Sequence, residues 1–344
     1  MFKNATVYRI GPAWATPMEE VEERLGKARF VPCGATQPES VGWVEPRGTA
    51  HGPLVEVIGG QWVLKLMVES KVLPGTVVKR KTDALVKKIE QETGRKPGKK
   101  QTKEIKEAAV LELLPMAFTK QSAVIVWIDP KHRLLLVDAG SQGKADAVVT
   151  HLVKALDGFA VTLVQTETAA ATAMAAWLTS HEAPAGFTVD RECELKSSDE
   201  MKSVVRYSRH TLDTDEVRDH ILGGKVPTRL AMTWEGRVSF MLTDTMQIKK
   251  ITFLDVVFEA SSKQSNKEDG FDADTAIATG EMSKLIPDLL DALGGELAGI
   301  GAASEASAVT PSAPTGSVKG TAASAAQVAP ALATGEATID EAPF

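Results

Sequence analysis

Two aspartates have the residue type and spacing that metal chemistry uses. Asp129 and Asp138 flank the turn-forming residues 130–132 and end two strongly apolar runs, 123–129 and 133–138. Carboxylates that meet at a hairpin can hold a divalent cation for phosphodiester hydrolysis. Carboxylates at strand ends also cap turns, which requires no cation. A metal-dependent nuclease is therefore one alternative for this chain, and turn capping by the same residues is the other.

Other catalytic patterns do not occur in the sequence. The six histidines never fall at H-E-x-x-H spacing, and no serine stands in G-x-S-x-G. Lys225 follows two glycines, but the preceding residues do not match a phosphate-binding loop. We expect Cys33 to be a small buried residue and not a nucleophile. The sequence therefore predicts a protein that is not an enzyme and binds no metal or cofactor.

Composition is typical of a soluble globular protein. The chain has 344 residues, of which 43% are hydrophobic and 24% charged, and this length predicts two or three structural units. Two distant cysteines, Cys33 and Cys193, exclude a disulfide scaffold and fit a reducing cytoplasm. Since no apolar run reaches about 18 residues, we expect no membrane-spanning helix.

Charge is unevenly distributed along the chain. The formal net charge is −6, yet between residues 76 and 120 twelve lysines and arginines stand against six acidic residues, a local net charge of +6. Such a block attracts a polyanion to one place on an acidic protein. The hairpin residues that we expect to contact nucleic acid are Lys79, Arg80, Lys87, Lys88, Arg95, Lys96, Lys99, Lys100, Lys103 and Lys106.

The basic block is predicted to form a helical hairpin. Val78, Leu85 and Ile89 recur on one helical face, the Gly/Pro-rich residues 93–98 form a loop, and a second helix covers 101–114. The alternative is a solvated hairpin whose charge is muted by i, i+4 ion pairs.

The remaining chain predicts the α+β class, with antiparallel β-hairpins, a meander and packed helices around the inserted basic hairpin. We divide it into an N-terminal part of the body (1–75), the basic hairpin (76–118), the rest of the body (119–299) and an Ala/Ser/Pro-rich tail (300–344) that we expect to be disordered. The most regular pattern is a meander over 229–234, 237–242 and 247–258. A last helix is expected over 274–293, with Asp272 and Asp274 at its entry and an interruption near Pro287.

Further basic residues precede and enter the meander. Alternation along a strand over 204–210 places Arg206 and His210 on one face and Arg209 on the other. Arg209, His210 and Lys225 are additional candidates for nucleic-acid contact, and the alternative is a set of charges that protects sheet edges from aggregation.

Scattered segments, in fixed order from residue 1 to about 296, resemble the recombination-associated RdgC family. The matching segments are Phe2-Lys3-Asn4, Phe30-Val31-Pro32-Cys33-Gly34, Gly42-Trp43-Val44, Leu113-Leu114-Pro115-Met116-Ala117-Phe118, Trp127-Ile128-Asp129, Leu134-Leu135-Leu136-Val137-Asp138 and Gly270-Phe271-Asp272-Ala273-Asp274.

The resemblance implies a ring-shaped homodimer that encloses double-stranded DNA without sequence preference and restrains the RecA recombinase. It further implies a cytoplasmic, nucleoid-associated protein whose subunits meet through the body and at the hairpin tips. By the same resemblance, Phe118 matches the interface phenylalanine that gates the dimer, and Arg95 and Lys225 match basic positions. His210 stands where a relative has glutamine. A protein-interaction module whose basic hairpin docks on an acidic partner remains a further alternative.

Overall fold

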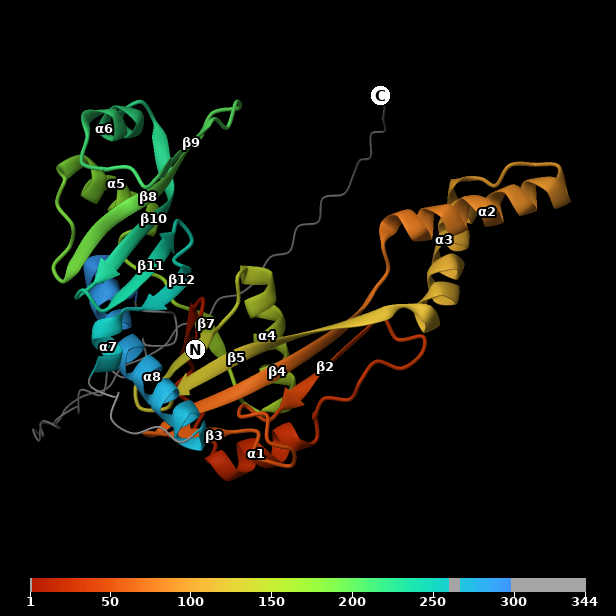
Figure 1. The fold of residues 1–344 in the computed structure, drawn as a ribbon, viewed down its shortest axis with the longest axis horizontal. Coiled ribbons are helices and arrows are strands. Elements are labelled where there is room, and N and C mark those ends of the chain that lie inside the picture. The colour runs from red at the N-terminus through yellow and green to blue at the C-terminus, as the bar shows by residue number, and fades with distance from the viewer. Residues whose placement is uncertain (1, 260–266, 298–344) are drawn as a thin grey trace, which may run out of the picture. The chain divides into compact units, whose positions relative to one another are not determined.

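The computed structural model describes residues 2–259 and 267–297 (Figure 1). These residues belong to one compact unit, and the predicted disordered segment 300–344 lies outside them. Their helices and strands confirm the α+β class. The helices are α1 Met18–Gly26, α2 Gly75–Thr93, α3 Lys99–Leu113, the 3₁₀ turn η1 Leu114–Met116, α4 Gln142–Ala155, α5 Ala170–Ser180, α6 Asp215–Leu222, α7 Asp255–Glu259 and α8 Lys267–Ala292.

Among the described residues, seven strands form a first antiparallel sheet. Its order is β2-β4-β5-β6-β1-β7, with β3 paired to β4. The turn at Gly59-Gly60 joins β3 to β4 with both glycines at positive φ, which a tight two-residue hairpin requires. The strands are β1 Thr6–Ile10, β2 Glu39–Val44, β3 Glu56–Ile58, β4 Gln61–Val72, β5 Phe118–Asp129, β6 Leu134–Val137 and β7 Val161–Leu163.

A second antiparallel sheet has the order β12-β11-β10-β8-β9. The predicted meander is present as β10, β11 and β12, but the third strand ends at Phe253 and the next residues form α7, so the expected strand to residue 258 was wrong. The strands are β8 Phe187–Ser197, β9 Val204–Ser208, β10 Lys225–Trp234, β11 Val238–Thr243 and β12 Ile248–Phe253.

The central part of the first sheet, which includes β6 and the C-terminal end of β5, is buried on both faces. One face packs against α1 and α4, through residues such as Leu25 and Leu152. The opposite face shares a core with the second sheet, α5 and α8, in which Trp127 and Phe240 are buried. A backbone bridge between Ala5 and Ile248 also joins the two sheets. The layers therefore follow from strand alternation, which sends successive apolar residues to two different cores.

Helix α8 differs from its prediction in two ways. It begins at Lys267, so Asp272 and Asp274 lie inside the helix and do not form its N-cap. Asp272 instead accepts a hydrogen bond from Arg47, whose guanidinium also lies 4.9 Å from the centre of the Phe271 ring. Pro287 is accommodated within the helix, and no interruption is present there.

Candidate nucleic-acid interface

Helices α2 and α3 form the predicted helical hairpin. Val78 and Thr82 of α2 are buried where the two helices pack, as are Ile105 and Ala109 of α3. The turn between them begins at Gly94, which ends α2 in the left-handed conformation that glycine favours. Figure 1 shows the paired strands β4 and β5 leading into this hairpin. The apolar contacts thus occupy the inner faces of both helices and leave the charged residues outside.

All ten predicted basic residues of the hairpin are exposed. Lys88 and Lys103 each have a carboxylate at 3.9 Å, on Glu92 and Glu107 respectively. In the part of the chain that the structure describes, the other eight make no ion pair within 4 Å. The expected muting by i, i+4 pairs is therefore slight, and the positive charge is available to a ligand.

The start of α3 concentrates this charge further. Lys99 and Lys100 occupy its first turn, which contains no acidic residue, and Arg95 and Lys96 stand in the preceding loop. A helix N-terminus carries partial positive charge and is stabilised by nearby anions, not by lysines. The sequence therefore places cations where local helix energetics disfavour them, which is the arrangement expected for an anion-binding surface.

The basic residues of the second sheet are more often neutralised. Arg206 donates to Glu194 at 2.6 Å, and this contact lowers the pKa of the Glu194 carboxyl below its ordinary value. Lys250 forms an ion pair with Glu192 at 2.8 Å. Arg206 and Glu194 join the neighbouring strands β9 and β8, whereas Lys250 of β12 and Glu192 of β8 belong to strands that are not adjacent. Both cations lie on the edge strands β9 and β12, as the sheet-edge interpretation expects.

The predicted alternation near Arg209 and His210 was wrong. Strand β9 ends at Ser208, and Arg209 has a φ of 56°, so the chain turns before either residue continues a strand. Both side chains are exposed. The Nδ1 of His210 lies 2.6 Å from the Thr211 carbonyl oxygen and donates to it, which leaves Nε2 as the atom that a ligand can reach.

Lys225 and His210 are connected through one aromatic residue. The rings of His210 and His220 lie 5.5 Å and 6.5 Å from that of Tyr207, measured between ring centres. Lys225, at the start of β10, donates to Nδ1 of His220 at 3.1 Å and is half-buried. Burial and a hydrogen bond to Glu216 raise the pKa of Tyr207 to about 12. The uncharged Tyr207 side chain therefore lies next to His210 and, through His220, is linked to Lys225.

An exposed apolar patch lies where the hairpin returns to the first sheet. Phe118 is 86% exposed and is the first residue of β5, paired across the strands with the half-exposed Val72. Leu111 and Met116 are exposed on the adjoining turns of α3 and η1. Phe118 thus lies at the junction of the hairpin with the sheet and not in the loop 94–98. Sequence reasoning identified Phe118 alone and missed its apolar neighbours.

Asp129 and Asp138 do not meet. Asp129 is fully buried and accepts from the backbone N–H and the Nδ1–H of His132, at 3.0 and 2.7 Å. Asp138 accepts from the backbone of Asn4 at 2.8 Å, and its own N–H bonds to Ile125. Because Ile125 lies four residues from Asp129 along β5, the backbone positions of the two aspartates are roughly 13 Å apart along the sheet. They cannot share a cation.

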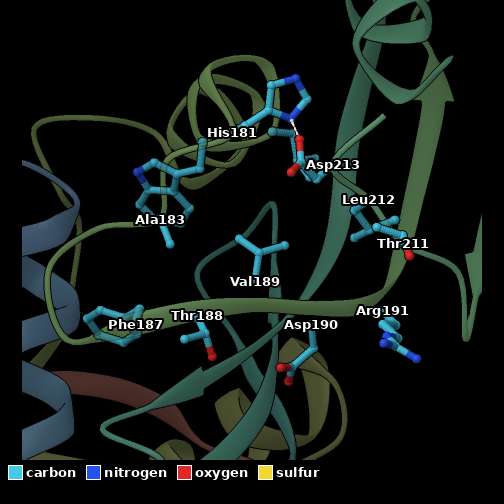
Figure 2. Close-up of a pocket in the computed structure, with 12 residues that line it drawn as sticks. His181, Ala183, Phe187, Thr188, Val189, Asp190, Arg191, Thr211, Leu212 and Asp213 are labelled. Atoms are coloured by element: carbon cyan, nitrogen blue, oxygen red, sulfur yellow. Dashed lines mark ion pairs between the residues drawn. The ribbon is translucent and has the colours of Figure 1, made fainter. Parts of the chain in front are cut away.

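A cavity of about 340 Å³ lies between α5 and β8 (Figure 2). Val189 points toward it, and at its edge Nδ1 of His181 lies 2.6 Å from a carboxylate oxygen of Asp213. His181 is the C-cap residue of α5, and sequence analysis did not foresee its pairing with Asp213. The described residues contain no cluster of three His, Cys, Asp or Glu side chains that could hold a metal ion.

The fold and the exposed cations define a class: an α+β protein of two antiparallel sheets with an inserted basic helical hairpin. A family model described as "Putative exonuclease, RdgC" matches residues 1–296. The chain belongs to the RdgC family. Within the described ranges, no helix combines the length and the apolar composition that a bilayer crossing demands.

This chain aligns with nearly the whole length of several relatives. A protein of Dechloromonas aromatica (strain RCB) is 44% identical over 300 residues, which are 86% of this chain and 98% of the relative. A protein of Janthinobacterium sp. (strain Marseille) is 45% identical over 297 residues, and one of Bordetella pertussis (strain Tohama I / ATCC BAA-589 / NCTC 13251) 42% over 296, with the same coverages. Each is named recombination-associated protein RdgC.

Proposed function

We propose that this protein binds double-stranded DNA without sequence preference, as a ring-shaped homodimer that encloses the duplex and modulates RecA-dependent recombination. The observation that carries the proposal is the exposure of all ten basic residues of the hairpin, eight of them without a carboxylate partner among the described residues. The names of the relatives, recombination-associated protein RdgC, agree with this role.

The physics of this surface favours phosphate over bases. Lysines and arginines on a rigid support neutralise phosphates and release condensed counterions, which binds any sequence and depends steeply on salt. The acidic remainder of the chain repels DNA elsewhere, so the hairpin is the preferred site. In this proposal Arg209, His210 and Lys225 supply additional donors to the phosphate backbone.

Closure around the duplex requires contacts between two subunits. The exposed patch of Val72, Leu111, Met116 and Phe118 is one such contact in this proposal, because apolar side chains of this size are buried when a partner covers them. A closed ring slows dissociation of DNA, and a duplex so occupied is withheld from RecA. Association with the nucleoid follows from non-specific binding to chromosomal DNA.

Duplex affinity measured against salt tests the proposal. Anisotropy with two labelled duplexes of unrelated sequence should give equal affinities and a slope of log K on log salt of about −0.9 for each phosphate contacted. Sedimentation of the same samples should show a dimer. Sequence-dependent affinity or a flat salt response would overturn the proposal. A protein-interaction module would bind an acidic polypeptide and leave the duplex free at moderate salt.

The family model's description makes exonuclease activity the second candidate. An end-labelled duplex incubated with the protein and Mg²⁺ or Mn²⁺ separates the two, since a binding protein retards the duplex and leaves its length unchanged. Shortening that stops with a chelator would establish the nuclease instead.

A further inference from the structure

Strand β5 has an open edge over more than half of its length. It pairs with β4 from Phe118 to Ile128, whereas β6 covers its other side only from Val126 to Asp129. Among the described strands, none pairs with that side over Phe118–Val124, which places this stretch at an edge of the sheet (Figure 1). Over these seven residues, the backbone groups that point away from β4 therefore have no strand partner.

This edge lacks most features that block pairing with another chain. It contains no proline, its register with β4 continues without a bulge, and Phe118 to Ala123 are exposed. Lys120 is its one charged residue. Long, regular edges of this kind pair readily with a further strand, and proteins usually interrupt them with proline, bulges or several charges.

We propose that the open edge of β5 pairs antiparallel with the same edge of a second copy, about a two-fold axis at Gln121. This inference rests on the proposed homodimer and names the backbone contact that forms it. In this register Thr119 faces the partner's Ala123, Lys120 faces the partner's Ser122, and Phe118 faces the partner's Val124.

The backbone directions follow from one hydrogen bond. The N–H of Asp138 donates to the carbonyl of Ile125 at 2.9 Å, so the groups of Ile125 point away from β4. Because these directions alternate along a strand, Thr119, Gln121 and Ala123 also point their N–H and C=O groups toward the open edge. A two-fold at Gln121 sets these three residues opposite one another, so their outward groups can exchange hydrogen bonds.

Two neighbouring registers also set outward-pointing residues opposite one another, but both are less favourable than the register centred on Gln121. A two-fold at Lys120 sets two lysines directly opposite, which destabilises a strand pair. A two-fold at Ser122 extends the pairing to Val126, whose edge β6 already occupies. The free stretch from Phe118 to Val124 is symmetric about Gln121, so only the central register uses all of it.

The adjoining surface favours a copy of this chain as the occupant. The pairing brings both Phe118 side chains to the ends of a continuous sheet, beside the exposed Val72 and Met116. Strand pairing and apolar burial then reinforce each other in one interface. The DNA-binding lysines of the hairpin belong to other elements and do not take part in the pairing.

Cysteine cross-linking of the full chain tests the register, in a Cys33→Ser background so that only introduced thiols are accessible. Residues directly opposite in a hydrogen-bonded pair have Cα atoms about 5.5 Å apart, within disulfide reach. Gln121→Cys should therefore give a covalent dimer with diamide. Thr119→Cys lies on the same face as Gln121, but its two copies are roughly 13 Å apart and should not cross-link.

A mixture of Thr119→Cys and Ala123→Cys proteins provides a second test that keeps Gln121 and its hydrogen bond to Glu69. These two should cross-link with each other. A protein that sediments as a dimer but yields neither cross-link overturns the strand pairing and leaves the proposed dimer intact. Cross-links without duplex binding would support the pairing and overturn the DNA-binding function. A monomeric protein would overturn the pairing as well.

Discussion

Arg237 and Glu281 tie the turn between β10 and β11 to helix α8 through two parallel hydrogen bonds. The guanidinium Nε donates to one carboxylate oxygen at 2.7 Å and Nη2 to the other at 2.6 Å. Glu281 is buried, and the arginine holds the pKa of its carboxyl below the ordinary value of 4.5. A lowered pKa in the folded protein means that the ionised carboxyl stabilises the fold.

Glu281→Gln should remove a pH-dependent part of the stability. In the native protein this contribution is complete above the ordinary pKa and is lost as the pH falls through the lower folded value. Urea unfolding at pH 7 should therefore show a less stable variant, and the difference should shrink between about pH 5 and pH 3. Glu200→Gln, at an exposed position, is the control. An equal difference at every pH would contradict the assigned ion pair.

Lys103→Glu with Lys106→Glu should weaken duplex binding equally for all sequences. Losing two phosphate contacts should flatten the slope of log K on log salt by about 1.8. Lys131→Glu with Lys144→Glu makes the same charge change at exposed lysines outside the hairpin and should leave the slope nearly unchanged. Equal slopes for the two double variants would mean that the hairpin lysines face away from DNA.

Phe118→Ala should loosen the contact between subunits while the monomer keeps its stability, because the side chain is 86% exposed. Loss of one buried aromatic anchor weakens association by about 1–3 kcal/mol. Retention on circular duplex after dilution should shorten accordingly. Met201→Ala, at a side chain 85% exposed in the turn between β8 and β9, is the matched control. Unchanged retention by Phe118→Ala would exclude a gate at this residue.

Asp129→Asn with Asp138→Asn should destabilise the protein and leave duplex affinity unchanged. At residue 129 an amide N–H₂ would replace a buried acceptor of the His132 ring, a loss of about 1–3 kcal/mol. Thermal unfolding and anisotropy measure the two effects. A metal-dependent loss of duplex length that disappears in this variant would show that the carboxylates do hold a cation.

Gly42→Ala should destabilise the fold strongly, because the added Cβ would lie 2.4 Å from Cα of Phe30. Overpacking of this kind against backbone costs about 1–3 kcal/mol or more. Gly34→Ala is a sharp control, since its Cβ would meet a flexible side-chain atom of Gln37 at 3.7 Å. Both glycines belong to the segments that resemble the RdgC family. Similar unfolding midpoints for the two variants would contradict the close approach.

Sequence patterns predicted those elements that are determined by residues close to one another in the chain. The α2–α3 hairpin and the meander turn at Glu235-Gly236 depend on residues within a few positions of one another. Strand β8 was missed because three acidic residues interrupt its apolar pattern and a bulge shifts its register with β10. Two of those acids, Glu192 and Glu194, find cationic partners only after the sheet has formed.

The candidate site likewise has parts that the sequence predicts and parts that depend on the folded structure. The basic block could be predicted because its charge is contiguous in sequence and its helices are amphipathic. The position of Arg209 could not, because a positive φ after β9 replaces the expected alternation. The open edge of β5 was equally unpredictable, since it depends on where β6 stops pairing, not on any residue of β5 itself.

Strand β6 places its four residues alternately in the two cores. Leu134 and Leu136 pack with the second sheet, whereas Leu135 and Val137 pack with α1 and α4. Strand β6 is therefore shared by both hydrophobic cores. If either the second sheet or the pair α1 and α4 unfolded, apolar side chains of β6 would be exposed to water. Unfolding of one layer therefore destabilises the other. The folded body is thereby expected to lose its structure in a single concerted transition.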